Sequence, residues 1–555
     1  MAQNQELWTD VADTEWYDAN KTAFDISTPQ QLAGVAKLVN EGTTSFAGCT
    51  FRLKQDIDLR GKQWVPIGVY NHDGWRIFEG SLDGQGHTIY RLTMDGNDSH
   101  QSSFLMGLIG CSEGDITIQD LKLQEVSVNG KDLTIEEFCA TGALIAYHSE
   151  GILTLHSCHA VSGWVTGGDG NYNTVTGGLV GAIDADIDFL DCSNGLTVTG
   201  GEEQDDMSEF GSCTGGLIGA TLRSNVIKSC INYGTVIGGS SANNSFTGGL
   251  FGLVDRSTVK DCYNTASVTG GEYVAEINVI GGIAGIVFGT SITNCFASGE
   301  LISGKSGYDF VTGGIVGYLG VDIDKSSSSV SNCLAIQSLI EGKNSDLRSA
   351  ELQSKALTPS GESVLRPVAP GKQFSSNSLL ARGGSSNQDA TRIEKREAEL
   401  RWVPAPVIVT HRIVGYNEDC PLSNNYAYVP GDWNQDEIGT DKLNGAEWSG
   451  RMDNAPIDIW DTKIWSIDPV HKLMPKHKWK RTAAVNNPIK FYQVTFNTMG
   501  GDDDSQTLFT YCDQPMDEPT APKKEGYVFN GWFTDNSYQT AWTFGESGDP
   551  VTKDM

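Results

Sequence analysis

The sequence predicts an all-β protein: a solenoid of short stacked strands with an N-terminal helical cap, followed by a small, separate β module. Three observations lead to this fold class. Glycine contributes 65 of 555 residues, well above the usual share of about 7%. A glycine motif recurs through the middle of the chain, and a cysteine recurs in phase with it. After residue 490 this pattern stops and a different strand pattern begins.

The glycine motif is the primary repeat. It reads TGGLVG at 176–181, TGGLIG at 214–219, TGGLFG at 247–252, IGGIAG at 280–285 and TGGIVG at 312–317, with weaker copies at 106–110 and 141–146. The spacing of 32 to 38 residues is typical of solenoid repeats. One such turn cannot bury its apolar face alone, so the turns are expected to stack about 4.8 Å apart. Gly-Gly permits the sharp corner that a side chain would block.

A second marker keeps the same phase. A cysteine follows each later motif, and a large apolar residue stands six positions beyond it; the pairs are Cys158 with Trp164, Cys192 with Val198, Cys230 with Val236, Cys262 with Val268, Cys295 with Leu301 and Cys333 with Leu339. We expect the cysteines to form a buried ladder of free thiols, because strand-like stacking disfavours the Cβ geometry of a disulfide. The other six cysteines show no pairing that the sequence decides.

Residues 1–77 are predicted to cap the first turn. Thr28 can serve as the N-cap of a helix over 29–41, with Pro29 at its first position and Gly42 as its stop. An apolar stripe of Leu32, Val35, Ala36 and Val39 would cover the solenoid end.

The chain beyond residue 340 is expected to contain three further parts. Residues 341–410 are rich in Ser and Pro and predict an exposed insertion or linker. Residues 411–490 predict a last turn and a C-terminal cap. Residues 491–555 predict the separate module, because 492–496 (YQVTF) alternates as a strand does.

The TGGLVG, TGGLIG and TGGLFG series resembles the GLUG-motif repeats of bacterial surface proteins, with the repeat region spanning residues 78–340. This resemblance implies a right-handed β-helix-like solenoid at an exported, adhesion-related location, and it implies no catalytic residues. Residues 491–555 resemble the Listeria–Bacteroides repeat, the internalin B-repeat, through VTFN at 494–497, GYVFNGW at 526–532 and PVTKDM at 550–555. That second resemblance implies a β-grasp-like module that is truncated at Met555.

Composition narrows the range of partners. The net charge of −31 disfavours nucleic acid and anionic membranes, since phosphate contacts need clustered Lys and Arg. No apolar run is long enough to span a bilayer, and the polar start lacks a signal peptide. A cytoplasmic protein and a mature exported one both fit, and the repeats favour a secreted or cell-surface monomer.

A binding edge is expected where the variable segments between the Gly-Gly corners stack, at 166–175, 200–213, 238–246, 270–279 and 303–311. The candidate binding residues there are Tyr172, Phe210, Tyr273 and Tyr308. Phe246 and Phe310 stand next to the corners and are better explained as buried plugs. Aromatic side chains of this kind stack on sugars or anchor protein partners.

Asp184, Asp186 and Asp188 alternate with Ala185, Ile187 and Phe189, so one strand should show three carboxylates on its outer face. A solvated face is the simplest explanation. Calcium binding is the candidate metal function, and acid–base catalysis on a polysaccharide is the third alternative.

The predicted function is therefore that of an adhesin-like binding protein for a host or microbial glycan or an extracellular protein. No cofactor other than Ca²⁺ is expected, and no H-E-x-x-H or G-x-S-x-G motif is present. Two alternatives stay open: a carbohydrate-active β-helix enzyme, a lyase or glycosidase, and a structural stalk.

Overall fold

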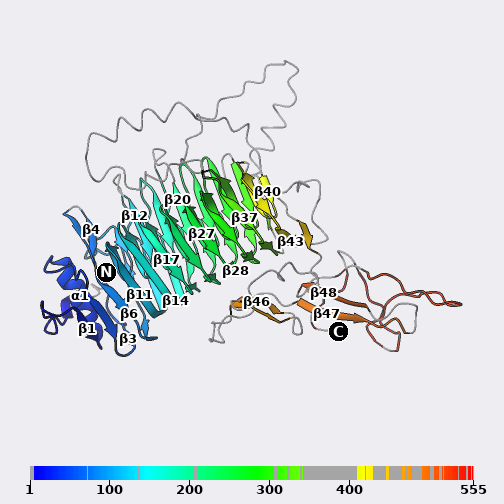
Figure 1. The fold of residues 1–555 in the computed structure, drawn as a ribbon, viewed down its shortest axis with the longest axis horizontal. Coiled ribbons are helices and arrows are strands. Elements are labelled where there is room, and N and C mark those ends of the chain that lie inside the picture. Colours follow the sequence, from blue (N-terminus) through cyan, green and yellow to red (C-terminus); the bar gives the residue numbers. More distant parts are fainter. Residues whose placement is uncertain are drawn as a thin grey trace, which may run out of the picture.

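The computed structural model describes the following residues: 6–71, 73–133, 138–204, 211–304, 309–321, 326–337, 340–341, 409–418, 420–428, 446–448, 465–468, 473–477, 491–499, 506–511, 516, 518–535, 537–544, 548–551, 553 and 555. Stacked parallel strands dominate them (Figure 1).

The N-terminal end is covered as the sequence predicts. The 3-10 helix η1 (Trp8–Val11) precedes α1 (Pro29–Asn40), which begins behind Thr28 and ends just before Gly42. The Thr28 side chain accepts the amide N–H of Gln31 at 3.2 Å, the usual N-cap bond. Six of the helix residues between Leu32 and Val39 belong to the solenoid core. Figure 1 shows α1 at the end of the strand stack where the chain begins.

The first wall of the solenoid is an eight-stranded parallel sheet. Its strands, one per turn, are β9 (Leu105–Met106), β12 (Cys139–Gly142), β15 (Thr174–Gly177), β20 (Ser212–Gly215), β25 (Ser245–Gly248), β30 (Ile277–Gly281), β35 (Asp309–Gly313) and β40 (Val409–His411).

The second wall is also an eight-stranded parallel sheet, and each of its strands follows a first-wall strand after a two-residue corner. It consists of β10 (Ile109–Ser112), β13 (Ile145–His148), β16 (Val180–Ile183), β21 (Ile218–Thr221), β26 (Phe251–Asp255), β31 (Ala284–Phe288), β36 (Val316–Gly320) and β41 (Val414–Asn417).

The third wall is the largest sheet, with 26 strands. Two long strands, β11 (Ile116–Asn129) and β14 (Ile152–Thr166), cross it unbroken, whereas other turns divide the same path into short strands. The short strands before them are β1 (Ala23–Ile26), β2 (Thr50–Leu53), β3 (Ile57–Asp58), β6 (Ser81–Asp83), β7 (Thr88–Tyr90) and β8 (Thr93–Asp95).

The short strands after β14 repeat in triplets. They are β17 (Asp186–Leu190), β18 (Ser193–Asn194), β19 (Thr197–Thr199); β22 (Asn225–Lys228), β23 (Ile231–Asn232), β24 (Val236–Ile237); β27 (Ser257–Lys260), β28 (Tyr263–Asn264), β29 (Val268–Thr269); β32 (Ser291–Thr293), β33 (Phe296–Ala297), β34 (Leu301–Ile302); and β37 (Ser329–Ser331), β38 (Leu334–Ala335), β39 (Ile340–Glu341). Strands β42 (Leu422–Ser423) and β43 (Tyr426–Tyr428) follow, and β44 (Ala446–Trp448) pairs in parallel with β43.

The ends of the ladder refine the predicted domain limits. Strand β1 pairs in parallel with β2, and β2 pairs with β6, so the ladder reaches back into residues 1–77. At the other end β40, β41, β42 and β43 pair with β35, β36, β37 and β38 and add a last turn. The predicted insertion at 341–410 lies, apart from its two ends, outside the described residues.

The glycine motif forms the corner between the first two walls and brings their backbones into contact. A Cβ on Gly177 would lie 1.8 Å from the Val180 carbonyl oxygen, so only glycine can make this corner. A Cβ on Gly181 would lie 2.5 Å from the Ala146 oxygen and 2.9 Å from the Thr141 nitrogen, atoms of the preceding turn. The third glycine of the motif therefore serves close wall-to-wall packing.

This close approach divides the apolar interior. A main core fills the lumen and runs from α1 to the last turn. A second core lies between the first and second walls, where Val175, Cys213 and Phe246 of one wall pack with Ala182 and Ala220 of the other. Both strand faces of these two walls are buried, which explains their continuous buried pattern.

The cysteine ladder is confirmed. Cys158, Cys192, Cys230, Cys262, Cys295 and Cys333 are free and buried, one per turn. Burial raises the pKa of the Cys158, Cys230, Cys295 and Cys333 thiols well above the ordinary value. Cys49, Cys111, Cys139 and Cys213 are also free, Cys420 is buried, and Cys512 lies outside the described residues.

The apolar residue six positions beyond each cysteine is expected to be buried. This prediction is confirmed in four turns and wrong for Trp164. Val198, Val236, Val268 and Leu301 are fully buried, but Trp164 is 41% exposed and pairs with Thr197. Val165 takes the interior position and pairs with Val198. The cause is one residue more between Ala160 and Trp164 than in the next turn, since Ala160 pairs with Asn194 whereas Trp164 pairs with Thr197. Leu339 lies outside the described residues, and Ile340 pairs with Leu301.

Three antiparallel hairpins stand apart from the parallel ladder. Strands β4 (Val69–Asn71) and β5 (Gly74–Arg76) form one beside the N-terminal cap. Strands β45 (Trp465–Asp468) and β46 (Leu473–His477) form a second. In the C-terminal module β47 (Phe491–Phe496) pairs with β48 (Gln506–Tyr511), and Val494, Phe496, Trp532 and Trp542 share a small core.

Candidate binding face

The variable segments between the third and first walls stack on one another, as their phase predicts. Isolated parallel bridges join Gly170 to Glu203, Glu203 to Ser241 and Ser241 to Val274. Four successive turns therefore present these segments along one edge of the solenoid. We call this surface the loop edge and define it by residues 166–175, 200–204, 211–213, 238–246 and 270–279.

A row of side chains runs along the loop edge and extends beyond it to Asp132 and Asn97 in the two earlier turns, and backbone amides of the following turns bind to it. The amide of Asp132 donates to Asn97 Oδ1 at 3.0 Å, that of Asp169 to Asp132 Oδ1 at 3.0 Å, and that of Glu202 to Asp169 Oδ1 at 2.8 Å. Farther along, the amide of Tyr273 donates to Ser240 Oγ at 3.3 Å. The row therefore presents carboxylates, a hydroxyl and a phenol at intervals of about 4.8 Å.

The sequence analysis did not predict this row, although a repeated glycine pair marks its position. A second glycine pair opens each variable segment, at 167–168, 200–201, 238–239 and 270–271, and the row residue follows it closely. A Cβ on Gly168 would lie 2.1 Å from the Lys131 carbonyl oxygen, and one on Gly201 would lie 2.0 Å from that of Gly168. These glycines let the segments stack tightly enough for the row to form.

Two of the four predicted binding residues are described. Tyr273 belongs to the row and is 67% exposed, and Tyr172 is half-buried three turns earlier. Three turn spacings separate the two segments by about 14 Å. Phe210 and Tyr308 lie outside the described residues. Phe246 and Phe310 are fully buried, so their interpretation as core plugs is confirmed.

Glu203 is an unexpected part of this edge because it is buried, with 1% of its surface exposed. Its carboxylate accepts a hydrogen bond from Ser241 Oγ at 2.6 Å, and the same hydroxyl accepts the amide of Asn243 at 3.0 Å. A buried carboxylate needs such donors. Glu203 therefore ties adjacent segments together from below while the row faces outward.

The acidic strand face has the predicted alternation but not the convergence of a metal site. Ala185, Ile187 and Phe189 are buried, while Asp186 and Asp188 are exposed. Asp184 forms an ion pair with Arg223 at 2.7 Å, and burial raises the pKa of its carboxyl, partly offset by that arginine. Asp188 lies 3.4 Å from His156.

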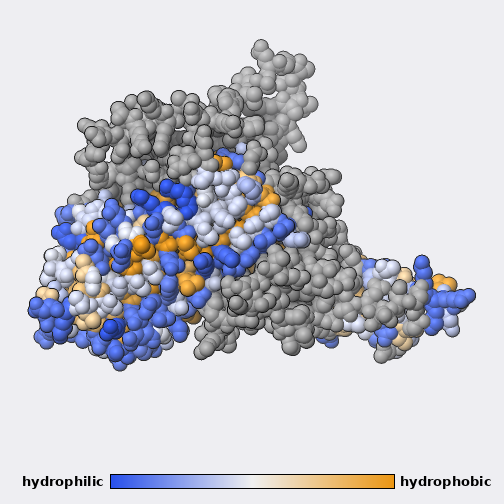
Figure 2. Space-filling view, viewed as in Figure 1, coloured by the Kyte–Doolittle hydropathy of each residue, from blue (hydrophilic) through white to orange (hydrophobic). Residues whose placement is uncertain are grey.

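Within the described ranges, no three acidic, histidine or cysteine side chains gather as metal ligands. Calcium binding at Asp184, Asp186 and Asp188 thus stays a prediction. Figure 2 shows the face of the solenoid seen in Figure 1, where hydrophilic and hydrophobic residues are interspersed.

Comparison with known proteins identifies one module. Residues 492–555 match the family model of the Listeria–Bacteroides repeat domain. This match confirms the resemblance seen in the C-terminal sequence. The solenoid residues are not covered by it, so the GLUG resemblance stays a prediction.

Three relatives share partial sequence similarity. Halomucin of Haloquadratum walsbyi is 30% identical over 144 residues, which are 24% of this chain and 2% of that protein. Two predicted membrane proteins of Evansella cellulosilytica, one described as glycine-rich, are 31% and 30% identical over 104 residues, or 19% of this chain. The matches span only 10% and 14% of those two proteins.

One solved structure is similar over most of its length. A predicted immunoglobulin A1 protease from Bacteroides ovatus aligns over 82% of this chain and 92% of its own, with 14% identity and a TM-score of 0.36. Among the described residues, no helix is long and apolar enough to cross a membrane.

Proposed function

We propose that the protein is an adhesin-like binding protein of the cell surface or the extracellular space, and that the loop edge is its contact face. The observation that supports this is the row of side chains, which hydrogen bonds between turns hold in two stretches, from Asn97 to Glu202 and from Ser240 to the Tyr273 amide. A contact surface that is already ordered loses little entropy when a partner binds.

The comparisons support the surface location in a general way. The Listeria–Bacteroides repeat adjoins the solenoid, and two of the relatives are described as membrane proteins. The partner we propose is a glycan or an extracellular protein. Tyr273 would supply the apolar contact, and Asp169 and Glu202 would accept hydrogen bonds from hydroxyl or amide groups.

The test is binding of the purified chain to an array of host and microbial glycans and matrix proteins. A variant with Tyr172→Ala and Tyr273→Ala should lose binding at least tenfold. A Trp164→Ala variant is the matched control, because Trp164 is an exposed aromatic on the third wall, outside the loop edge.

Equal loss in both variants would contradict the assignment to the loop edge. No binding at any spot would contradict the adhesin proposal and favour a stalk.

A further inference from the structure

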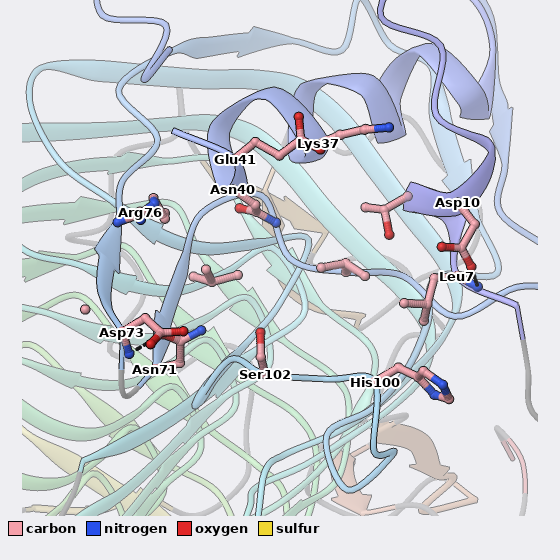
Figure 3. A pocket seen from close by; sticks show the side chains of 14 residues that line it. Leu7, Asp10, Lys37, Asn40, Glu41, Asn71, Asp73, Arg76, His100 and Ser102 are labelled. Carbon is pink, nitrogen blue, oxygen red and sulfur yellow. Dashed lines mark hydrogen bonds between the residues drawn. The ribbon is translucent and has the colours of Figure 1, made fainter. Parts of the chain in front are cut away.

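Beside the N-terminal cap lies a polar pocket that the proposed function does not use. Its volume is about 590 Å³, within the range of about 300–1,000 Å³ usual for small-molecule sites. Four segments far apart in the sequence line it: the start of the chain around Asp10, the end of α1 with Lys37 and Glu41, the β4–β5 hairpin, and the loop that carries His100 and Ser102 (Figure 3).

Four charged side chains of this pocket are not engaged in ion pairs with any residue that the structure describes, whereas Asp10 accepts the Leu7 amide at 3.1 Å. Lys37, Glu41, Asp73 and Arg76 form no ion pair with any described residue. Other charges near the cap are paired, for example Arg60 with Asp58. Among the described residues, Arg76 donates to the neighbouring Trp75 carbonyl, at 3.0 Å.

Cations and carboxylates alternate around the pocket rather than separating into two halves. Figure 3 shows Arg76 on the same side as Asp73 and Asn71, while Lys37 extends from α1 toward the side of Asp10. Leu7, Val65 and Val69 add apolar surface. A simple anion would lie close to a carboxylate, and a simple cation would lie close to Lys37 or Arg76, so either would meet an unfavourable charge. A zwitterion would need the positive and the negative groups of the pocket gathered at separate ends.

Hydrogen bonds and ring stacking connect the elements around the pocket. Asn40 donates to the Pro66 carbonyl at 2.9 Å and accepts the Gly68 amide at 3.0 Å, which joins the end of α1 to the segment just before β4. Tyr70 and Trp75 stack across the hairpin at 4.0 Å. A cavity held open in this way is pre-organised for a ligand.

From this arrangement we infer that the pocket binds one or two units of a neutral saccharide. Each sugar hydroxyl both donates and accepts, so it can donate to Asp10, Asp73 or Glu41 and accept from Lys37 or Arg76. Planar carboxylate and guanidinium groups suit pairs of neighbouring hydroxyls. The partly exposed Leu7 and Val65 would contact the C–H face of a sugar ring. This site is independent of the loop edge.

The experiment is saturation-transfer NMR on the full chain with glucose, galactose, mannose, N-acetylglucosamine, lactose and maltose, beside the zwitterion Ala-Ala. We expect transfer to at least one sugar. A double variant, Asp73→Ala with Arg76→Ala, should reduce its affinity at least tenfold.

The matched control is Asp25→Ala with Arg52→Ala, which removes the same two residue types from neighbouring exposed positions on β1 and β2. It should bind as the unmodified chain does. Transfer to Ala-Ala alone, to no probe, or equally to both double variants would overturn the saccharide site. Because Tyr172 and Tyr273 stay intact here, failure of this test leaves the loop-edge proposal unaffected.

Discussion

At the scale of single residues, backbone conformation decides which side chains the repeat accepts. The residue before each ladder position has positive φ, near +55°, and the column consists of Asp120, Ser157, Asp191, Ser229, Asp261, Asn294, Asn332 and Asn424. Asp and Asn tolerate this left-handed conformation better than most residues. Each residue of this column turns the chain sharply just before a ladder position. The column is therefore part of the repeat, even though its residue types vary.

Two single glycine substitutions test directly whether the first and second walls pack closely. Gly181→Ala would place its Cβ against backbone atoms of the preceding turn, so we expect unfolding to become easier by about 1–3 kcal/mol. Gly170→Ala is the control, since its nearest neighbour would lie at 3.5 Å, an ordinary contact. Urea denaturation followed by circular dichroism measures both. Equal midpoints would show that the walls are not packed as closely as described.

His148 should make stability depend on pH. The side chain is fully buried, and its Nδ1 shares a hydrogen bond with Ser112 Oγ at 3.0 Å. Burial lowers the pKa of the imidazole to about 4. The unfolded chain takes up this proton below about pH 6.5, whereas the folded chain does so only near pH 4. Stability should therefore fall by about 3 kcal/mol as pH drops from 6.5 to 4, then level off.

The measurement compares denaturation midpoints of the unmodified chain and His148→Gln between pH 7 and 4. The difference between the two should change across this window. Asp191 acts in the opposite direction, since burial raises its pKa to about 6, but it is present in both proteins. A pH-independent difference would contradict a neutral buried His148.

At the scale of elements, the third wall is held by polar ladders as well as by apolar packing. Asn194 donates through Nδ2 to Asn232 Oδ1 at 2.9 Å, and Asn232 donates in the same way to Asn264 at 2.9 Å. Each side chain also bonds its own backbone two residues on, as with Asn232 Nδ2 and the Gly234 carbonyl at 2.8 Å. These side chains lie against the glycine corner, 2.5 Å from a Cβ built on Gly178 or Gly216.

Asn232→Asp should be the most damaging change in this ladder. A carboxylate cannot donate to Gly234 or Asn264 and would be buried without a cation, which costs about 3–5 kcal/mol. Asn232→Ala should cost less, because Ala297 and Ala335 occupy the same ladder position in later turns. Thermal denaturation at pH 7 and 4 should show the gap between the two variants narrowing at pH 4, where the carboxyl is protonated. The opposite ranking would contradict the ladder.

At the scale of the whole molecule, an open solenoid must protect the ends of its sheets. Helix α1 and the cluster of Trp16, Phe24, Phe46 and Phe51 close the N-terminal end, where the rings contact one another edge to face and by stacking. Strand β1 is the terminal strand of the described ladder and pairs with β2 alone.

Detaching the cap should therefore cause self-association. Val35 is fully buried in α1, so Val35→Asp would place a charge in the core and release the helix. We expect oligomers by size-exclusion chromatography with light scattering, whereas Gln30→Asp, an exposed change in the first turn, should leave the elution unchanged. A monomeric Val35→Asp protein with an intact spectrum would show that the cap is not needed.

The sequence by itself determined the repeat, its phase and the N-terminal cap. The Gly-Gly corners, the cysteine ladder and the Thr28–Pro29 helix start are local signals, since each depends on one residue type fitting one backbone conformation. The exposure of Trp164 could not be predicted, because the extra residue between Ala160 and Trp164 shows only in the pairing with the following turn.

Only the tertiary structure decided which side chains meet. The row from Asn97 to Tyr273, the burial of Glu203 and the pocket between α1 and the β4–β5 hairpin all join residues 30 or more positions apart. The length of each turn varies, so sequence distance does not fix which residues stack. Hydrogen bonds between turns then determine whether a polar residue faces solvent, as Asp186 does, or is buried, as Glu203 is.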